Sequence, residues 1–154
     1  MTIADTTTDP YPQVARELAL LLRRARSLAT TMSKRAHPAL DATMYPMLAH
    51  IARTPEVHGC DLAAQFGVGR ATISRQVSHL ESLGLVSRHP DPQDARGQLI
   101  ELTPEGDVLV TNASEAWRLR LSEALSDWSP DDVAILATSL GRLNETIDES
   151  LRTP

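Results

Sequence analysis

Three arginines with the chemistry to bind nucleic acid lie close together in this 154-residue chain. Arg70, Arg75 and Arg88 share residues 70–88 with a single acidic side chain, Glu81. A guanidinium group pairs with phosphate oxygens, or with the edge of guanine, through two parallel hydrogen bonds. The residues between these arginines include alanine, threonine and serine, whose short side chains allow close approach to a base edge. We expect this segment to contact a double helix, and an ordinary solvated helix face is the alternative.

The net charge of −5 hides an uneven distribution of charge along the chain. Residues 1–58 carry seven basic and five acidic side chains, residues 59–103 four and five, and residues 104–154 four and ten, which gives +2, −1 and −6. The acidic excess lies at the C-terminal end, so a local positive surface is compatible with it. Two Trp, two Tyr and one Phe are too few to stack the bases of a single strand. Any nucleic acid partner is therefore expected to be double-stranded DNA.

Other reactive residues give no sign of an enzyme, a metal site or a cofactor. The sequence shows no nucleophile with a base, no convergent pair of acids and no phosphate-binding glycine loop. Cys60 is the only cysteine, which excludes an internal disulfide and a CxxC motif. The sequence His58-Gly59-Cys60 is only a weak metal motif. A direct sensor of metal or oxidant stays open as an alternative.

The sequence also predicts a chain that does not enter a membrane. Its longest apolar runs, such as residues 18–22, are far shorter than the roughly 20 residues that span a bilayer. The first residues, Met1 to Asp5, lack the basic and apolar regions of a signal peptide. We therefore predict a cytoplasmic protein.

Apolar periodicity predicts the helices that must hold the arginine-rich segment. Side chains repeating every 3.6 residues, with proline and glycine at the ends, indicate helices over about residues 10–36, 43–54, 60–66, 70–83, 104–128 and 130–151. In the helix over residues 70–83, the apolar side chains share one side and small, polar or cationic ones the other. The apolar side comprises Ile73, Val77 and Leu80, and the opposite side comprises Ala71, Arg75, Ser78 and Ser82.

A hairpin follows this helix and completes a recognisable arrangement. Residues 85–88 and 98–102 have the composition of strands, and the loop between them is rich in proline and aspartate. Helix, tight turn at Gly67, helix and hairpin form a winged helix-turn-helix, whose second helix enters the major groove while the wing reaches the minor groove. The predicted fold is mainly α with a small β-hairpin wing, flanked by N- and C-terminal dimerisation helices.

The stretch from Asp94 to Gly106 resembles the wing signature of the MarR family, the multiple antibiotic resistance regulators. That signature is D-x-R, five residues and L-T-x-x-G, and every fixed position matches. The resemblance covers about residues 12–152. Upstream, the family's helix-turn-helix is similar to Asp61-Leu62-Ala63, Gly67-Val68, Ile73-Ser74-Arg75, Leu80-Glu81 and Gly84-Leu85-Val86.

The resemblance implies a homodimeric transcriptional regulator, usually a repressor, that binds pseudo-palindromic DNA. By position, Arg96 is expected to enter a minor groove and Asp94 to orient the wing. Ala95 departs from the arginine or glycine common there, which implies one charge fewer on this wing. The predicted DNA-binding residues are Arg70, Ala71, Thr72, Ser74, Arg75, Ser78, His79, Arg88, Asp94 and Arg96.

The resemblance also implies that a small ligand, commonly phenolic or anionic, often releases the DNA. In the family its pocket lies between the DNA-binding lobe and the dimerisation helices. The corresponding candidates here are His37, Met44, Tyr45, Met47 and Trp117, and an ordinary place in the core is the alternative for each.

The predicted organisation has four parts: a flexible N-terminus over residues 1–9, an N-terminal dimerisation helix over 10–36, a DNA-binding lobe over 41–103 and C-terminal dimerisation helices over 104–152. Two chains that pair their terminal helices around a two-fold axis would cover the apolar stripes of those helices, which favours a homodimer. The main alternative is a winged-helix protein-interaction module without DNA binding, which would suit the acidic total charge.

Overall fold

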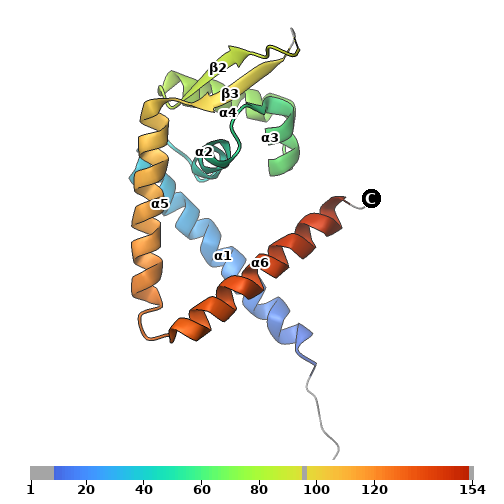
Figure 1. Cartoon of the computed structure of the whole chain (residues 1–154), viewed down its shortest axis with the longest axis vertical. Coiled ribbons are helices and arrows are strands. Elements are labelled where there is room, and N and C mark those ends of the chain that lie inside the picture. The colour runs from blue at the N-terminus through green and yellow to red at the C-terminus, as the bar shows by residue number, and fades with distance from the viewer. Residues whose placement is uncertain (1–8, 95–96, 153–154) are drawn as a thin grey trace, which may run out of the picture. The chain divides into compact units, whose positions relative to one another are not determined.

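The computed structural model of this chain describes residues 9–94 and 97–152 (Figure 1). The chain divides into two compact units, Met1–Ala113 and Ser114–Pro154. Two residues of the predicted wing tip, Ala95 and Arg96, lie outside the described residues, as do residues 1–8. The elements, in chain order, are α1 (Tyr11–Ala36), α2 (Met44–Arg53), β1 (Val57–His58), α3 (Gly59–Phe66), α4 (Arg70–Ser82), β2 (Val86–Pro90), β3 (Gln98–Leu102), α5 (Pro104–Ala124) and α6 (Pro130–Arg152).

The predicted fold class is confirmed: the chain is mainly helical and carries a small antiparallel sheet. Helix α3 ends at Gly67, whose φ of 62° lies in the left-handed region that glycine adopts without strain. This turn leads within three residues into α4, which spans 13 residues. Helix, turn and helix are therefore where the sequence predicts them.

The wing is broader than the predicted hairpin because a third strand joins it. Strand β3 lies between β1 and β2, and both neighbours run antiparallel to it. Val57 of β1 pairs with Ile100, and Val86 of β2 pairs with Leu102. A two-residue strand is too short to show an alternating pattern, so the sequence analysis missed β1.

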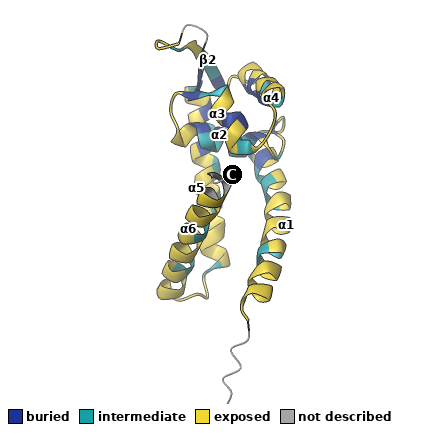
Figure 2. Ribbon diagram, turned by 90° about the vertical axis from the view of Figure 1, so that its right-hand side faces the viewer, coloured by how far each residue is buried: buried dark blue, intermediate teal, exposed yellow. Residues whose placement is uncertain are grey.

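The hydrophobic core belongs to the first unit and fixes the position of α4. Leu48 of α2, Leu62 of α3 and Leu80 of α4 are completely buried and belong to one cluster with Ile100 of the wing. Figure 2 shows the buried residues concentrated in α2, α3, α4 and the wing, whereas most of α1, α5 and α6 is exposed. Helix α4 and the wing therefore pack on one shared hydrophobic core.

The base of the wing is joined tightly to the start of α5. Thr103 Oγ1 donates a hydrogen bond of 2.6 Å to the Gly84 carbonyl and accepts one of 3.1 Å from the Gly106 amide. A Cβ atom on Gly106 would lie 2.0 Å from the Leu85 carbonyl oxygen, so this position accepts only glycine. The threonine and glycine of the wing signature thus have a packing role, and Thr103 is the N-terminal cap that the sequence predicts.

The terminal helices leave apolar side chains exposed in the single chain. In α1, Val14 is 55% exposed and Leu22 is 56% exposed; in α6, Ile135 is 65% exposed. None of the helices in the described part of the chain is both long and apolar enough to cross a membrane.

Candidate nucleic-acid interface

Helix α4 presents the surface that the sequence analysis expects to contact DNA. Its apolar side is buried in the core through Ile73, Val77 and Leu80. Ala71 and Arg75 lie on the opposite side and are exposed, as is Arg70 at the first turn. The exposed side is therefore small and cationic, which are the properties that a groove-reading helix needs.

One flank of α4 is joined to the wing through Arg88 of β2. The Arg88 guanidinium donates hydrogen bonds to Ser78 Oγ at 2.9 Å and to the Ser74 carbonyl at 3.3 Å. Its Nε atom lies 3.6 Å from a carboxylate oxygen of Glu81, and the side chain is only 23% exposed. Arg88 and Ser78 were both predicted to bind DNA, and in the structure they bond to each other. DNA contact by Arg88 and Ser78 stays a prediction. The geometry shows that the two side chains join the wing to α4.

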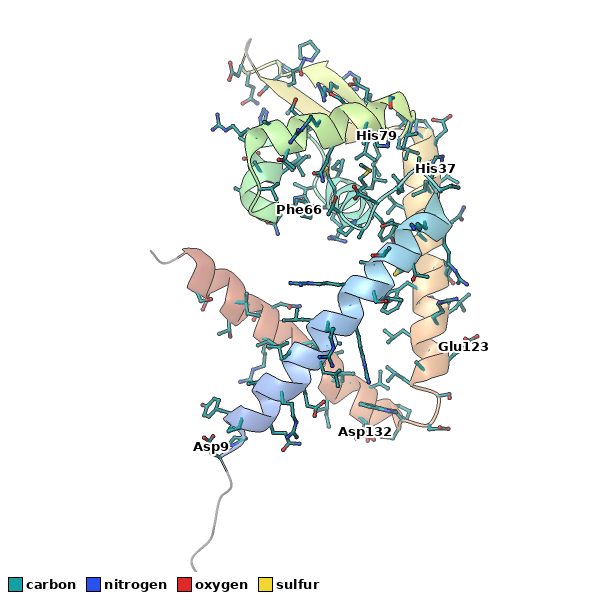
Figure 3. The ribbon with its side chains drawn as sticks, turned by 180° about the vertical axis from the view of Figure 1, so that it is seen from behind. Asp9, His37, Phe66, His79, Glu123 and Asp132 are labelled. Carbon is teal, nitrogen blue, oxygen red and sulfur yellow. The ribbon has the colours of Figure 1, made fainter. Side chains whose placement is uncertain are left out.

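The other flank of α4 faces the linker between α1 and α2. Gln76 Nε2 donates a hydrogen bond of 2.7 Å to Thr43 Oγ1. His79 Nε2 lies 3.4 Å from the Ala39 carbonyl oxygen, and Figure 3 shows His79 on the side of α4 toward His37 at the end of α1. His79 was predicted to contact DNA, and this stays a prediction; in the structure its ring lies beside the linker.

The linker is itself ordered by the carboxylate of Asp41. This group accepts hydrogen bonds from the Thr43 amide at 2.7 Å, the Thr43 hydroxyl at 2.6 Å and the Met44 amide at 3.1 Å, at the start of α2. Partial burial raises the pKa of Asp41, but the three hydrogen bonds and the nearby His79 ring outweigh it and hold the pKa below its usual value. The ionised carboxylate is therefore the form that caps α2.

The root of the wing is held by a second set of polar contacts. His58 Nε2 of β1 lies 3.3 Å from Asp91 Oδ2. The Asp91 amide donates to the Gly97 carbonyl at 3.1 Å, and the Gly97 amide donates to the Asp94 carbonyl at 2.8 Å. Asp94 was predicted to orient the wing, and its carbonyl accepts the hydrogen bond from the Gly97 amide. Its role toward DNA stays a prediction, as does that of Arg96, which is outside the described residues.

A cavity of about 370 Å³ lies between α3, α4 and the wing, and the sequence analysis missed it. It is formed by residues from five separate elements, so no local pattern could reveal it. Exposed Cys60 lines it, with its Sγ atom 3.6 Å from Asp61 Oδ1. Within residues 9–94 and 97–152, no three His, Cys, Asp or Glu side chains gather where they could hold a metal ion. The lining residues include His58, Cys60, Arg70, Ser74, Arg88 and Gln98.

The predicted effector residues fall in different environments. Met44 and Met47 are buried in the core of the first unit. His37 Nδ1 accepts a hydrogen bond of 3.2 Å from the Ala39 amide, and Tyr45 is half-buried. Trp117 is half-buried and belongs to the second unit. An effector pocket formed by these side chains stays a prediction.

Comparison with known proteins gives a consistent result for the same region. The sequence profile of the MarR family matches residues 40–97, which include α2, α3, α4 and β2. The uncharacterised HTH-type transcriptional regulator YxaD of Bacillus subtilis is 27% identical over 137 residues, which are 89% of this chain and 94% of that protein.

Solved structures share the fold. FabT of Streptococcus pneumoniae in complex with DNA matches with a TM-score of 0.76 and 15% identity, over 90% of this chain and 98% of that one. A MarR family transcriptional regulator of Listeria monocytogenes in complex with a 26-mer DNA matches with a TM-score of 0.72 and 19% identity, over 89% and 90% of the two chains. At these identities the structural likeness supports the fold alone.

Proposed function

We propose that this chain is a transcriptional regulator of the MarR family that binds a pseudo-palindromic DNA site as a homodimer and represses transcription from it. Regulators of this family are DNA-binding proteins without enzymatic activity, so no reaction is assigned to the chain. The observation that carries the proposal is the exposed, small and cationic side of α4, presented by a helix whose opposite side is buried.

The expected mode of binding follows from this surface. Helix α4 lies in the major groove, where Arg75 reads a base edge and Arg70 near the helix start contacts a phosphate. Ala71 gives the helix room to approach the bases, and Thr72 and Ser74 supply short hydrogen-bonding side chains. The wing follows the backbone to the neighbouring minor groove, where Arg96 is expected to enter. The relatives solved with DNA support this assignment by their fold.

The exposed apolar side chains of α1 and α6 support the homodimer. Val14, Leu21 and Leu22 on α1, together with Ile135 and Ile147 on α6, are all more than two-fifths exposed in the single chain. Burying such side chains between two chains releases about 25 cal/mol for each Å² of apolar surface. A two-fold dimer then presents two copies of α4, whose half-sites lie about one turn of DNA apart.

Release by a small phenolic or anionic ligand is the regulatory part of the proposal. Such a ligand shifts the dimer away from DNA only if it binds the conformation that cannot reach both half-sites more tightly than the one that can. The similarity to the MarR family supports release of the DNA by a small ligand. The candidate residues around the linker, His37 and Tyr45, adjoin the segment that contacts α4.

Footprinting of the purified full-length protein on the DNA upstream of its own gene tests the proposal. We expect protection of two inverted half-sites about 10 base pairs apart, an affinity that falls steeply as salt rises, and weaker protection in the presence of an effective phenolic acid. Equal affinity for the upstream DNA and for a scrambled duplex would contradict sequence-specific regulation. A protein that binds no duplex would favour the protein-interaction module.

A further inference from the structure

Helix α4 has one side buried in the core, one exposed side and two flanks between them, and one flank meets the linker between α1 and α2. At about 100° per residue, Gln76 and His79 fall on this flank, between the buried and the exposed sides. We propose that Asp41, Thr43 and Gln76 are positioning residues that set the orientation of α4 for base reading. This inference rests on the proposed function, because it concerns how the same helix meets DNA.

The direction of each hydrogen bond makes these three residues one continuous chain. The Thr43 hydroxyl has a single proton, and it donates this proton to Asp41 Oδ1 at 2.6 Å. Its oxygen can therefore only accept from Gln76, and it does so from Nε2 at 2.7 Å. An ionised acceptor at the end of such a chain polarises each bond along it. Asp41 thereby fixes which way the Gln76 amide faces.

These linked hydrogen bonds act where the apolar core alone gives little control over the rotation of α4 about its axis. Apolar contacts through Ile73, Val77 and Leu80 hold α4 against the lobe, but such contacts have no preferred direction around the helix axis. The polar contacts are directional, and they lie on both flanks: Gln76 toward the linker and Ser78 toward Arg88. A helix held on both flanks keeps its exposed side aimed at the groove. Reading side chains need this support because a shift of about 1 Å is enough to lose specific contacts.

Two substitutions of similar size both remove the hydrogen bond between Thr43 and Gln76, and Thr43→Val also removes the hydroxyl's bond to Asp41. Thr43→Val removes the hydroxyl and keeps the shape of the side chain, and Gln76→Met removes the amide and keeps an unbranched side chain. The matched controls are Thr30→Val and Gln13→Met on α1. Thr30 Oγ1 bonds only within its own helix, to the Arg26 carbonyl at 3.1 Å, and Gln13 is exposed. All variants are made in the full chain, and thermal unfolding and sedimentation confirm that each is folded and in the wild-type oligomeric state.

The measurement is the ratio of affinities for the footprinted operator and for a scrambled duplex of equal length. We expect each single variant, and the double variant, to lower the operator affinity about three- to tenfold while affinity for the scrambled duplex changes less than twofold. The double variant should lose no more than the worse single variant, since both break the same bond. The two control variants should match the wild type in both affinities.

Three results would overturn the inference. If only Gln76→Met loses operator affinity, Gln76 reads a base directly and the linker does not position α4. If losses at the two sites add, or if both duplexes are affected equally, the residues do not act as one chain on base reading. If the variants keep the wild-type ratio, the hydrogen bonds have no bearing on orientation. Failure of the proposed function is separate and visible in the wild type, which would then not prefer its operator over the scrambled duplex.

Discussion

Arg88 and Ser78 join the wing to the reading helix through a hydrogen bond of 2.9 Å between the guanidinium group and the serine hydroxyl. The two residues lie ten positions apart, one on β2 and one on α4. An arginine that sequence alone assigns to DNA is thus engaged inside the protein. Its contribution to DNA binding and its contribution to stability become separable by experiment.

Substitution of Arg88 by alanine is expected to destabilise the fold. The change removes two hydrogen bonds from a charged donor and the contact with Glu81, so we expect the free energy of unfolding in urea to fall by about 1–2 kcal/mol. If the guanidinium group stays engaged with α4 when DNA binds, the dependence of DNA affinity on salt keeps its wild-type slope. A slope reduced by about one, with stability unchanged, would instead show that Arg88 binds a phosphate.

Gly106 is expected to tolerate no side chain. In Gly106→Ala, the new methyl group would lie 2.0 Å from the Leu85 carbonyl oxygen, so the base of the wing must move away from α5. We expect a loss of about 3 kcal/mol in the free energy of unfolding. The matched control is Gly141→Ala in α6, where a methyl group meets nothing within 4 Å, and this change should stabilise the helix by about 0.5–1 kcal/mol. Equal effects of the two substitutions would contradict the packing of the wing signature described above.

The sequence predicts the core side of α4 well because it follows from periodicity. Ile73, Val77 and Leu80 repeat at helical spacing, and all three are buried. Gly67 and Thr103 are equally predictable, since a left-handed turn and a helix cap each depend on one residue type. These features are local, and a local pattern is enough to reveal them.

Contacts between distant segments are what the sequence could not reveal. Gln76 bonds to Thr43 across 33 positions, and His58 pairs with Asp91 across the wing. A polar residue looks the same in sequence whether it faces water, DNA or another segment, so the sequence could not reveal that His79 lies beside the linker or that Arg88 bonds to α4. The two-residue strand β1 was missed for a related reason, because only its pairing with β3 defines it.

The terminal helices are expected to dimerise through their apolar sides. Leu22→Glu places a charge on the exposed apolar side of α1, twice in a symmetric dimer, and we expect sedimentation equilibrium to show a monomer at micromolar concentration. Thr30→Glu, about 180° around the same helix from the apolar Leu21, should leave the wild-type mass unchanged. A Leu22→Glu protein of unchanged mass would place the dimer interface elsewhere or exclude one.

Acid is expected to weaken the cap of α2. The folded pKa of Asp41 is below its usual value, so the carboxylate stabilises the fold fully above the unfolded pKa of about 4, and this stabilisation is lost as pH falls through the folded pKa. Between pH 5 and 2.5, the free energy of unfolding of Asp41→Asn should therefore fall less steeply than that of the wild type. The matched carboxyl control is Asp127→Asn at the turn between α5 and α6. If Asp41→Asn follows the wild-type curve, the ionised carboxylate does not stabilise the linker.

The most direct test of the proposed function is the operator preference of Arg75→Ala. Arg75 is exposed on α4 opposite the buried side, so the account predicts a loss of about 1–3 kcal/mol in operator affinity, a smaller loss on a scrambled duplex and unchanged thermal stability. Arg142→Ala removes the same charge from α6, which is far from α4 in the sequence, and it should leave the operator preference intact. If Arg75→Ala and Arg142→Ala retain the wild-type ratio of operator to scrambled affinity, α4 does not read DNA through Arg75 and the central claim is contradicted.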